Sequence, residues 1–139
     1  MGLPVYEDNS APPAEMSKIT LNCIVKENPG SIFHVSIDRK KSVYTLKKTI
    51  KKELRHIFMD VDAVSIKLWF VQIGQDDTRL GDLVNNSVED VFEGTAVYEA
   101  QRETSVENYL NHFKNTNDDD IHVIVHGRRI VLPHLRNPM

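Results

Sequence analysis

Histidines are the first candidates for chemistry in this chain, because imidazole is the commonest metal ligand among side chains. Six are present, and His122 and His126 stand four residues apart. On a strand this spacing puts both on one face but about 13 Å apart, too far to share a metal. No carboxylate or cysteine completes a ligand set at a recognisable spacing. We therefore interpret them as polar histidines on a sheet surface and predict no metal site.

Other reactive residue types are equally unsupported. The triplet Asp118-Asp119-Asp120 lacks the alternating ligands, glycine and terminal glutamate of a calcium loop, so it is interpreted as a solvated loop. Cys23 is the single cysteine, which excludes a disulfide within the chain, and its apolar neighbours favour a small buried hydrophobe. There is no glycine-rich phosphate loop and no local Ser-His-Asp or Cys-His pattern. We predict no catalytic residue, no cofactor and no small-molecule substrate: the protein is not an enzyme.

Composition is that of an ordinary soluble protein, but charge is divided into blocks. The 139 residues are 40% apolar and 27% charged, with a net charge of -3. Residues 38–55 hold eight basic against two acidic side chains, a net charge of +6, whereas residues 75–120 hold three against twelve, a net charge of -9. Such separation is typical of a polarised binding surface. The overall charge argues against a membrane surface as partner.

The basic block is the candidate binding surface. Few aromatic residues that could stack on bases accompany it, which disfavours nucleic acid and leaves an acidic protein as the expected partner. The alternative is a solvated helix face whose lysine stems shield an apolar stripe. Both interpretations stay open for the seven residues concerned: Arg39, Lys40, Lys41, Lys48, Lys51, Lys52 and Arg55.

Two alternating strands are predicted near the start of the chain. Between 18 and 26 the residues that share one face are Ile19, Leu21, Cys23 and Val25, with Ile24 as the exception. Asn28-Pro29-Gly30 is the expected turn, with glycine free to adopt positive φ. The second strand follows with Phe33, Val35 and Ile37 on one face, so an antiparallel hairpin is predicted.

One amphipathic helix comes next. Ser42 is its predicted N-cap, and lysines are expected on its flanks and outer face. One apolar stripe follows from three- and four-residue spacing: Val43, Leu46, Ile50, Leu54 and Ile57. After a loop at 58–63 with a short helical turn, a third strand is predicted over 65–73. There Trp69 points away from Leu68 and Phe70, either under the acidic segment that follows, which we favour, or exposed as an interface anchor.

The remainder is less regular. Leu80, Leu83, Val88, Val91 and Phe92 suggest an irregular strand and a short helix, and a further helix is expected at Val106, Tyr109, Leu110 and Phe113. The last strand alternates through Ile121, Val123 and Val125 and is expected beside the first strand in the sheet centre. The order predicts an α+β ubiquitin-like β-grasp: a mixed sheet of four to five strands over one main helix, with an acidic helical insertion before the last strand.

Domain limits follow from composition. We predict a disordered N-terminal tail over 1–17, one domain over 18–126, and a C-terminal tail or truncated linker over 127–139. The start of the chain is not a conventional secretory signal. The chain ends Leu135-Arg136-Asn137-Pro138-Met139 without the C-terminal diglycine of ubiquitin, so it is not expected to be a conjugated modifier.

These elements resemble the N-terminal header domain of the Crinkler effectors of oomycetes and some fungi, over about three quarters of the chain. The matching pieces lie in order along the sequence: Leu21-Asn22-Cys23-Ile24-Val25, Phe33-His34-Val35-Ser36-Ile37-Asp38, Lys41 to Lys51, Val61-Asp62-Ala63, Ile66 to Val71, Glu107-Asn108-Tyr109-Leu110 and Ile121-His122-Val123-Ile124-Val125. The stretch Leu68-Trp69-Phe70-Val71-Gln72 is similar to the strand that carries the LFLAK motif of the family, but lacks its alanine and lysine. A translocation role ascribed to that motif is therefore not carried over.

The resemblance implies a non-catalytic module that acts in delivery or protein–protein interaction, with a protein partner that includes host proteins among the candidates. It also implies secretion and entry into a host cell, in virulence or symbiosis. Family members continue into a second module and a C-terminal effector domain, which this sequence does not contain. The alternative expectation is a stand-alone intracellular ubiquitin-like adaptor that binds an acidic protein partner through a basic edge, on which the second strand and the helix are expected to form one continuous positive face.

Overall fold

The computed structural model describes residues 18–58, 61–113 and 119–127. The two predicted tails, apart from Gly127, lie outside these residues. The same is true of Met59 and Asp60 in the predicted loop and of residues 114–118, which include the first part of the acidic triplet.

Five strands form one mixed sheet, as the sequence predicts. They are β1 (Lys18–Val25), β2 (Asn28–Asp38), β3 (Ile66–Ile73), β4 (Tyr98–Glu99) and β5 (Ile121–Gly127). Their order is β2-β1-β5-β3-β4, with β1 and β5 parallel and the other neighbours antiparallel. The last strand therefore lies in the centre beside the first. A hairpin, a helix and a central parallel last strand make this α+β fold a ubiquitin-like β-grasp.

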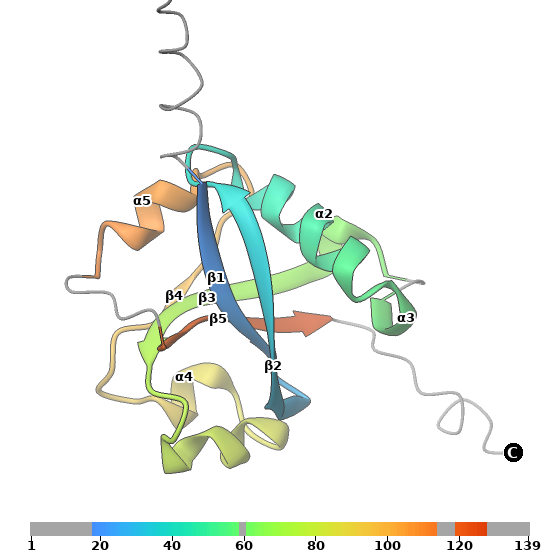
Figure 1. Ribbon diagram of the computed structural model, residues 1–139. Helices are drawn as coiled ribbons and strands as arrows, with labels where there is room; N and C mark the ends of the chain where they lie inside the picture. Colours follow the sequence, from blue (N-terminus) through green and yellow to red (C-terminus); the bar gives the residue numbers. More distant parts are fainter. Residues whose placement is uncertain (1–17, 59–60, 114–118, 128–139) are drawn as a thin grey trace, which may run out of the picture.

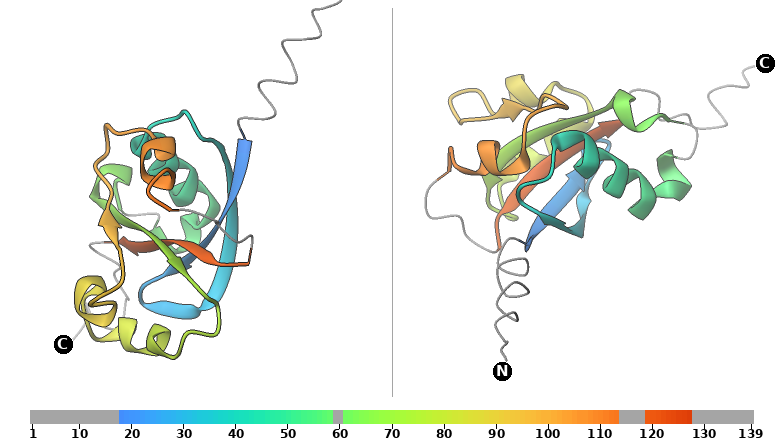
Figure 2. Two further views of the ribbon diagram at one scale, coloured as in Figure 1. Left: turned by 90° about the vertical axis from the view of Figure 1, so that its left-hand side faces the viewer. Right: turned by 90° about the horizontal axis from the view of Figure 1, so that it is seen from above.

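Helices cover both faces of the sheet (Figure 1). On one face lie α2 (Val43–Glu53), α3 (Arg55–Phe58) and α5 (Val106–Leu110). The 3-10 turn η2 (Ala63–Ser65) lies between α3 and β3 in the chain. The 3-10 helix η3 (Thr78–Val84) and α4 (Val88–Val91) lie on the opposite face. Seen from above, α2 and α5 lie on the same side of the sheet (Figure 2).

The first core fills the space between the sheet and α2. The predicted helix stripe enters it, with Val43, Leu46 and Ile50 completely buried and Leu54 and Ile57 packed at its border. Leu21, Cys23 and Val35 come from the strands, as their alternation predicts. The ring of Tyr109 stacks on Phe70 at 4.9 Å and brings α5 onto the same core.

A second core lies beneath the acidic segment (residues 75–120). It explains why Ile24 and Ile121 depart from the strand alternation predicted from the sequence. Ile24 is fully buried there rather than exposed, and Trp69 is 5% exposed, which confirms its predicted place under this segment. Ile121 also packs here, although its alternation predicts the face of Val123 and Val125. The register of β3 and β5 shifts between Phe70 and Ile73, so regular alternation does not extend to Ile121.

The predicted turn of the hairpin was placed too late. The chain turns at Lys26 and Glu27, and Pro29 and Gly30 belong to β2. Because β2 is an edge strand, a proline without an N–H is tolerated there. A register shift after Ile24 accommodates the extra residues. Among the described glycines only Gly94 has positive φ, at 88°, so the expected role of Gly30 is wrong.

The cap of α2 is confirmed, but one of its lysines is not where the pattern placed it. The Ser42 hydroxyl accepts a hydrogen bond from the Thr45 backbone N–H at 3.2 Å. Lys47, expected on a flank or the outer face, is only 6% exposed. Arg102 and Glu99, from the segment that crosses this side of the helix, lie in its surroundings.

Between β3 and β5 the predictions hold in part. Residues expected to form an irregular strand lie instead in η3, followed by α4, and the strand of this segment is the two-residue β4. Leu80, Leu83 and Phe92 pack into the second core in helical geometry. The predicted helix at Val106 and Tyr109 is confirmed as α5.

Candidate binding surface

Four of the seven predicted basic residues line one groove, here called the basic groove. Its walls are formed by side chains of α2 and α3 on one side and Ala63 of η2 on the other; the lining residues are Tyr44, Lys48, Lys51, Lys52, Arg55 and Ala63. Spacings of three and four residues bring the cations onto one face of the helix. None of them forms an ion pair with any carboxylate in the described part of the chain. The groove thus concentrates positive charge that no carboxylate of the described residues pairs with.

Tyr44 supplies an aromatic surface at one end of this groove, and the sequence prediction missed it. Its side chain is 38% exposed, with Lys48 Nζ 4.9 Å from the ring centre and the Arg102 guanidinium carbon 5.9 Å away. Cations over an aromatic face are attracted by its quadrupole. Tyr44 precedes Lys48 by one helical turn, which is the signal that could have found it. Arg102 could not be found this way, because it is distant in sequence.

Lys47 on α2 is surrounded by the positive charges of Arg102 and Lys67 and the negative charge of Glu99. Burial lowers the pKa of the Lys47 ammonium, the nearby Arg102 charge lowers it further, and Glu99 acts in the opposite direction. Glu99 in turn forms a partly exposed ion pair with Lys67, with 3.7 Å between Nζ and Oε2. Lys47 therefore shares the Glu99 carboxylate with Lys67.

The other three predicted residues occupy a separate place, in the connection between β2 and α2. Here the backbone carbonyls of Arg39 and Lys41 accept hydrogen bonds at 2.8 Å from the N–H groups of Glu107 and Val106. Lys40 donates its own N–H to Asp38 Oδ1 at 2.9 Å. The connection holds the start of α5 against the domain. The Arg39 side chain lines a different cavity, beside β1.

The basic block is thus distributed over two locations, and no β2 residue lines the basic groove. The sequence argument had expected a single face formed by the second strand and the helix. The helix presents Lys48 and Lys52 toward the η2 side instead, because Val43, Leu46 and Ile50 fix its rotation on the sheet. The binding role of these residues remains a prediction.

The LFLAK-like strand is buried in β3. Leu68, Trp69, Phe70 and Val71 are each at most 5% exposed, and β3 pairs with β4 and β5 on its two sides. Gln72 is half-buried at the register shift. In the folded domain Leu68, Trp69, Phe70 and Val71 belong to the two cores and leave almost no surface that a partner could contact.

The histidine pair has two different environments. His122 is 5% exposed, so the expectation of a surface histidine is wrong for it; its Nδ1 accepts a hydrogen bond from the Asn22 backbone N–H at 3.0 Å. His126 is partly exposed, with its ring near Trp69 and its Nδ1 beside the Glu27 carboxylate. Both interactions contribute to the packing of β5.

Cys23 is completely buried in the first core, as predicted. Burial raises the pKa of its thiol far above the ordinary value of 9.0. The thiolate, which is the reactive form, is therefore strongly disfavoured.

The fold and the surface together define a small α+β domain of the ubiquitin-like β-grasp class. Residues 19–126 match the family model described as the Crinkler effector protein N-terminal domain. The chain belongs to this family, which confirms the resemblance noted in the sequence.

A relative from Rhizophagus irregularis agrees with this assignment. Over 81 residues the chain is 43% identical to a protein named Crinkler effector protein 1. The alignment covers 57% of this chain and 17% of the relative, so the chain spans less than a fifth of the length of that protein. In the described part of the chain no helix has the length and apolarity needed to cross a bilayer.

Proposed function

We propose that this chain is a non-catalytic N-terminal module of a Crinkler-type effector that is secreted and acts inside a host cell. Its role is delivery or protein–protein interaction, and any catalytic activity belongs to a C-terminal effector domain. The match to the family model over 19–126 supports the first part of this proposal. The small share of the relative that the chain covers is consistent with a module of a longer protein.

The basic groove is the surface that we propose for the protein partner. Lys48, Lys51, Lys52 and Arg55 present positive charge around an exposed tyrosine, and none of them pairs with a carboxylate of the described residues. An acidic segment would gain charge-assisted hydrogen bonds there, and Tyr44 offers an apolar surface for a neighbouring side chain. The partner is therefore an acidic protein segment rather than nucleic acid, which would require more exposed aromatics.

Delivery through an exposed LFLAK-like motif is not part of this proposal. Trp69 and its neighbours in β3 are needed for the cores, so they are accessible only if the domain unfolds. A role in translocation that requires a folded domain must use another surface.

Charge reversal tests the groove. The probe is a fluorescein-labelled peptide of alternating glutamate and leucine, titrated against the full chain and followed by fluorescence anisotropy. The triple substitution Lys48→Glu, Lys51→Glu, Lys52→Glu should weaken binding at least about tenfold, because it replaces three attractive charges by repulsive ones. The control Lys18→Glu, Lys26→Glu, Lys40→Glu changes net charge equally outside the groove and should have a smaller effect.

Equal loss in both triple variants would show that only net charge matters, and the groove proposal would then be wrong. Undiminished binding by the groove variant would also contradict the groove proposal. We expect each variant to retain the fold, because these lysines make no ion pair with a described residue. Circular dichroism and thermal unfolding of each variant check this.

A second experiment distinguishes the proposed module of a longer effector from a stand-alone adaptor that uses the same groove. An antibody against residues 16–126 reports the mass of the native protein in its own organism. A species well above 15.9 kDa supports the module of a longer effector. A species at 15.9 kDa supports the adaptor and contradicts the proposed C-terminal effector domain.

A further inference from the structure

Among the described strands, the first half of β1 has a neighbour on only one side. β1 pairs with β2 along its length, from Lys18 opposite Asp38 onward. Its pairing with β5 includes only Cys23, Ile24 and Val25. From Lys18 to Leu21 no strand in the described ranges lies on the β5 side. This leaves a free strand edge within the sheet, at the place where β1 and β5 diverge.

The direction of the backbone groups along this edge follows from the ladder. Lys26 donates its N–H to Val125 on the β5 side, and the Asn22 N–H points the same way, to His122. Because successive residues of a strand direct their backbone groups to opposite sides, Thr20 also directs its N–H and C=O toward the β5 side. At Asn22 the backbone N–H on this side is already bonded to the His122 imidazole. At Thr20 the backbone groups on this side form no backbone hydrogen bond with a described residue.

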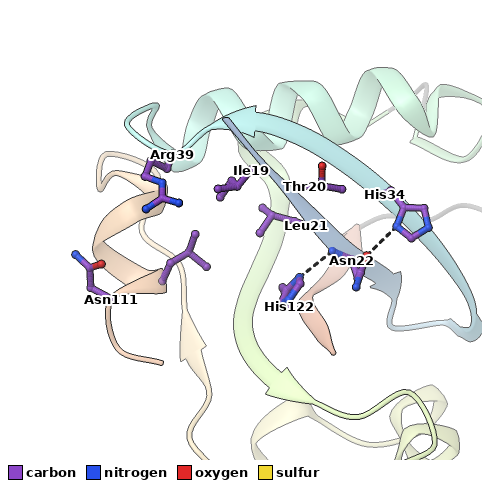
Figure 3. Close-up of a pocket in the computed structure, with 9 residues that line it drawn as sticks. Ile19, Thr20, Leu21, Asn22, His34, Arg39, Asn111 and His122 are labelled. Atoms are coloured by element: carbon purple, nitrogen blue, oxygen red, sulfur yellow. Dashed lines mark hydrogen bonds between the residues drawn. The ribbon is translucent and has the colours of Figure 1, made fainter. Parts of the chain in front are cut away.

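A cavity of about 690 Å³ surrounds this edge (Figure 3). It is lined by Ile19 and Leu21, which point to the first core, and by Thr20 and Asn22, which point to the opposite face. Side chains from both faces of one strand can line the same cavity only around its edge. Leu110 and Asn111 at the end of α5 form the far wall. The volume lies within the range of about 300–1,000 Å³ that is typical of ligand sites.

Arg39 provides the charge of this cavity. Figure 3 places its side chain between α5 and Ile19. Its Nε is buried and has no hydrogen-bond partner among the described residues, and its guanidinium forms no ion pair with any of them. A buried donor without a partner is costly and would be satisfied by a carboxylate. Asp38 pairs with Lys18, so Arg39 lies just beyond the start of β1.

We propose that this cavity binds an extended acidic peptide, which adds as a short strand to the Lys18–Leu21 edge of β1. Its backbone exchanges hydrogen bonds with Thr20, and one carboxylate pairs with Arg39. Four residues of a strand span about 13 Å. The acidic residue of the peptide therefore stands about two residues away from the peptide residue that lies opposite Thr20. The apolar side chains of Ile19, Leu21 and Leu110 receive a β-branched residue between these two points. A free anion would satisfy Arg39 but leave the Thr20 backbone and the apolar wall unused.

The test is an NMR titration of the ¹⁵N-labelled full chain. The probe is the peptide acetyl-Ser-Asp-Val-Thr-Val-Ser-amide, which brings its aspartate to the Arg39 end when it runs parallel to β1 with its threonine opposite Thr20. Its controls carry asparagine in place of aspartate or an N-methyl group on the second valine, whose N–H donates to the Thr20 carbonyl in this register. We expect shifts of the Thr20 and Leu21 amides and slower hydrogen exchange at Thr20. Both control peptides should bind at least about tenfold more weakly, because one loses the carboxylate and the other a strand hydrogen bond.

Matched protein variants separate the parts of the proposal. Arg39→Gln retains the backbone carbonyl that holds α5 and should weaken the aspartate peptide about tenfold without affecting the asparagine peptide. Lys40→Gln, at the adjacent position outside the cavity, should leave binding unchanged. The groove variant with Lys48, Lys51 and Lys52 reversed should also bind normally, so failure here and failure of the basic groove are distinguishable.

Three results would overturn the proposal. One is the absence of shifts at Thr20 at millimolar peptide. Another is binding of succinate as tight as that of the peptide, which would make the cavity a small-anion site. The third is a set of shifts confined to Lys48, Lys51 and Lys52, which would assign the peptide to the basic groove.

Discussion

The indole Nε1 of Trp69 donates a hydrogen bond to the Glu89 carboxylate at 2.8 Å. This contact joins β3 to α4 and thus fastens the acidic segment over the second core. Trp69 is nearly inaccessible, whereas Glu89 remains exposed on its far side. Buried indoles usually find such a partner, because an unpaired N–H would be costly.

Removal of that acceptor should destabilise the domain. For Glu89→Ala we expect the free energy of unfolding to fall by about 1 kcal/mol, which is below the usual contribution of a charged acceptor because Glu89 is solvated. Urea unfolding followed by fluorescence of the single tryptophan measures this loss. Glu89→Gln, which keeps an acceptor oxygen, should recover part of it. Glu93→Ala, at an exposed position nearby, serves as the control and should change little; equal stability of all variants would contradict the structural role of the contact.

The burial of Trp69 also shows what the sequence could predict. Alternation of Leu68, Trp69 and Phe70 assigned two faces to β3, and the apolar spacing of Leu46 and Ile50 assigned one face to α2. These are local patterns with periods of two and 3.6 residues, and the structure confirms them. The central place of the last strand beside the first was also predicted, and the parallel pairing of β1 and β5 confirms it.

Features that depend on distant segments were not predictable in this way. Lys47 occupies a position that helical spacing assigns to a flank, and its burial arises from a segment about fifty residues later, which includes Glu99 and Arg102. His122 is buried because its ring replaces a missing strand partner of Asn22. For the candidate site, the block of basic residues in the sequence included the three lysines and the arginine that line the groove. Tyr44 and the separate cavity at Arg39 were not predicted.

The helix cap gives a second stability prediction. Ser42→Ala removes the hydroxyl that accepts from the Thr45 N–H, and the free energy of unfolding should fall by about 1 kcal/mol. Ser42→Asp restores an acceptor and adds a negative charge at the helix N-terminus, so it should retain the wild-type stability. Thermal unfolding of the three proteins in parallel measures this difference. A Ser42→Asp variant as unstable as Ser42→Ala would show that the cap is not the cause.

Cys23 should be protected from thiol reagents in the native state. Its side chain is 0% exposed and burial raises its pKa, so an aromatic disulfide reagent should react only through unfolding. The reaction rate should increase with urea in proportion to the unfolded population. Rapid labelling of the native protein, at the rate of a short cysteine peptide, would contradict the burial.

The same pKa shift gives a dependence on pH. Above the ordinary value of 9.0 the unfolded thiol loses its proton while the folded one retains it, so this group contributes stability that is lost as pH rises. Cys23→Ala should remove that contribution, at a cost in packing of about 1 kcal/mol. Comparison of wild type and variant by urea unfolding at pH 7 and pH 10 should show a gap that narrows at the higher pH.

Lys47 should have the opposite dependence on pH. Its pKa in the folded state is lowered by burial and by Arg102, so the charged form is penalised in the fold. Below the folded pKa both states are protonated and the penalty is present in full. As pH rises from that pKa toward the ordinary value of 10.5, only the unfolded state retains the proton, and stability increases.

Replacement by methionine tests this sign. Lys47→Met keeps the apolar length of the side chain and removes the charge, so it should be more stable than wild type at pH 7. Its advantage should shrink as pH rises toward the ordinary pKa of 10.5, because wild type loses its penalty as the folded ammonium gives up its proton first. Lys48→Met, one position along α2 and exposed, is the matched control and should give no comparable gain. A Lys47→Met variant less stable than wild type at pH 7 would show that the ammonium makes a net stabilising interaction with Glu99.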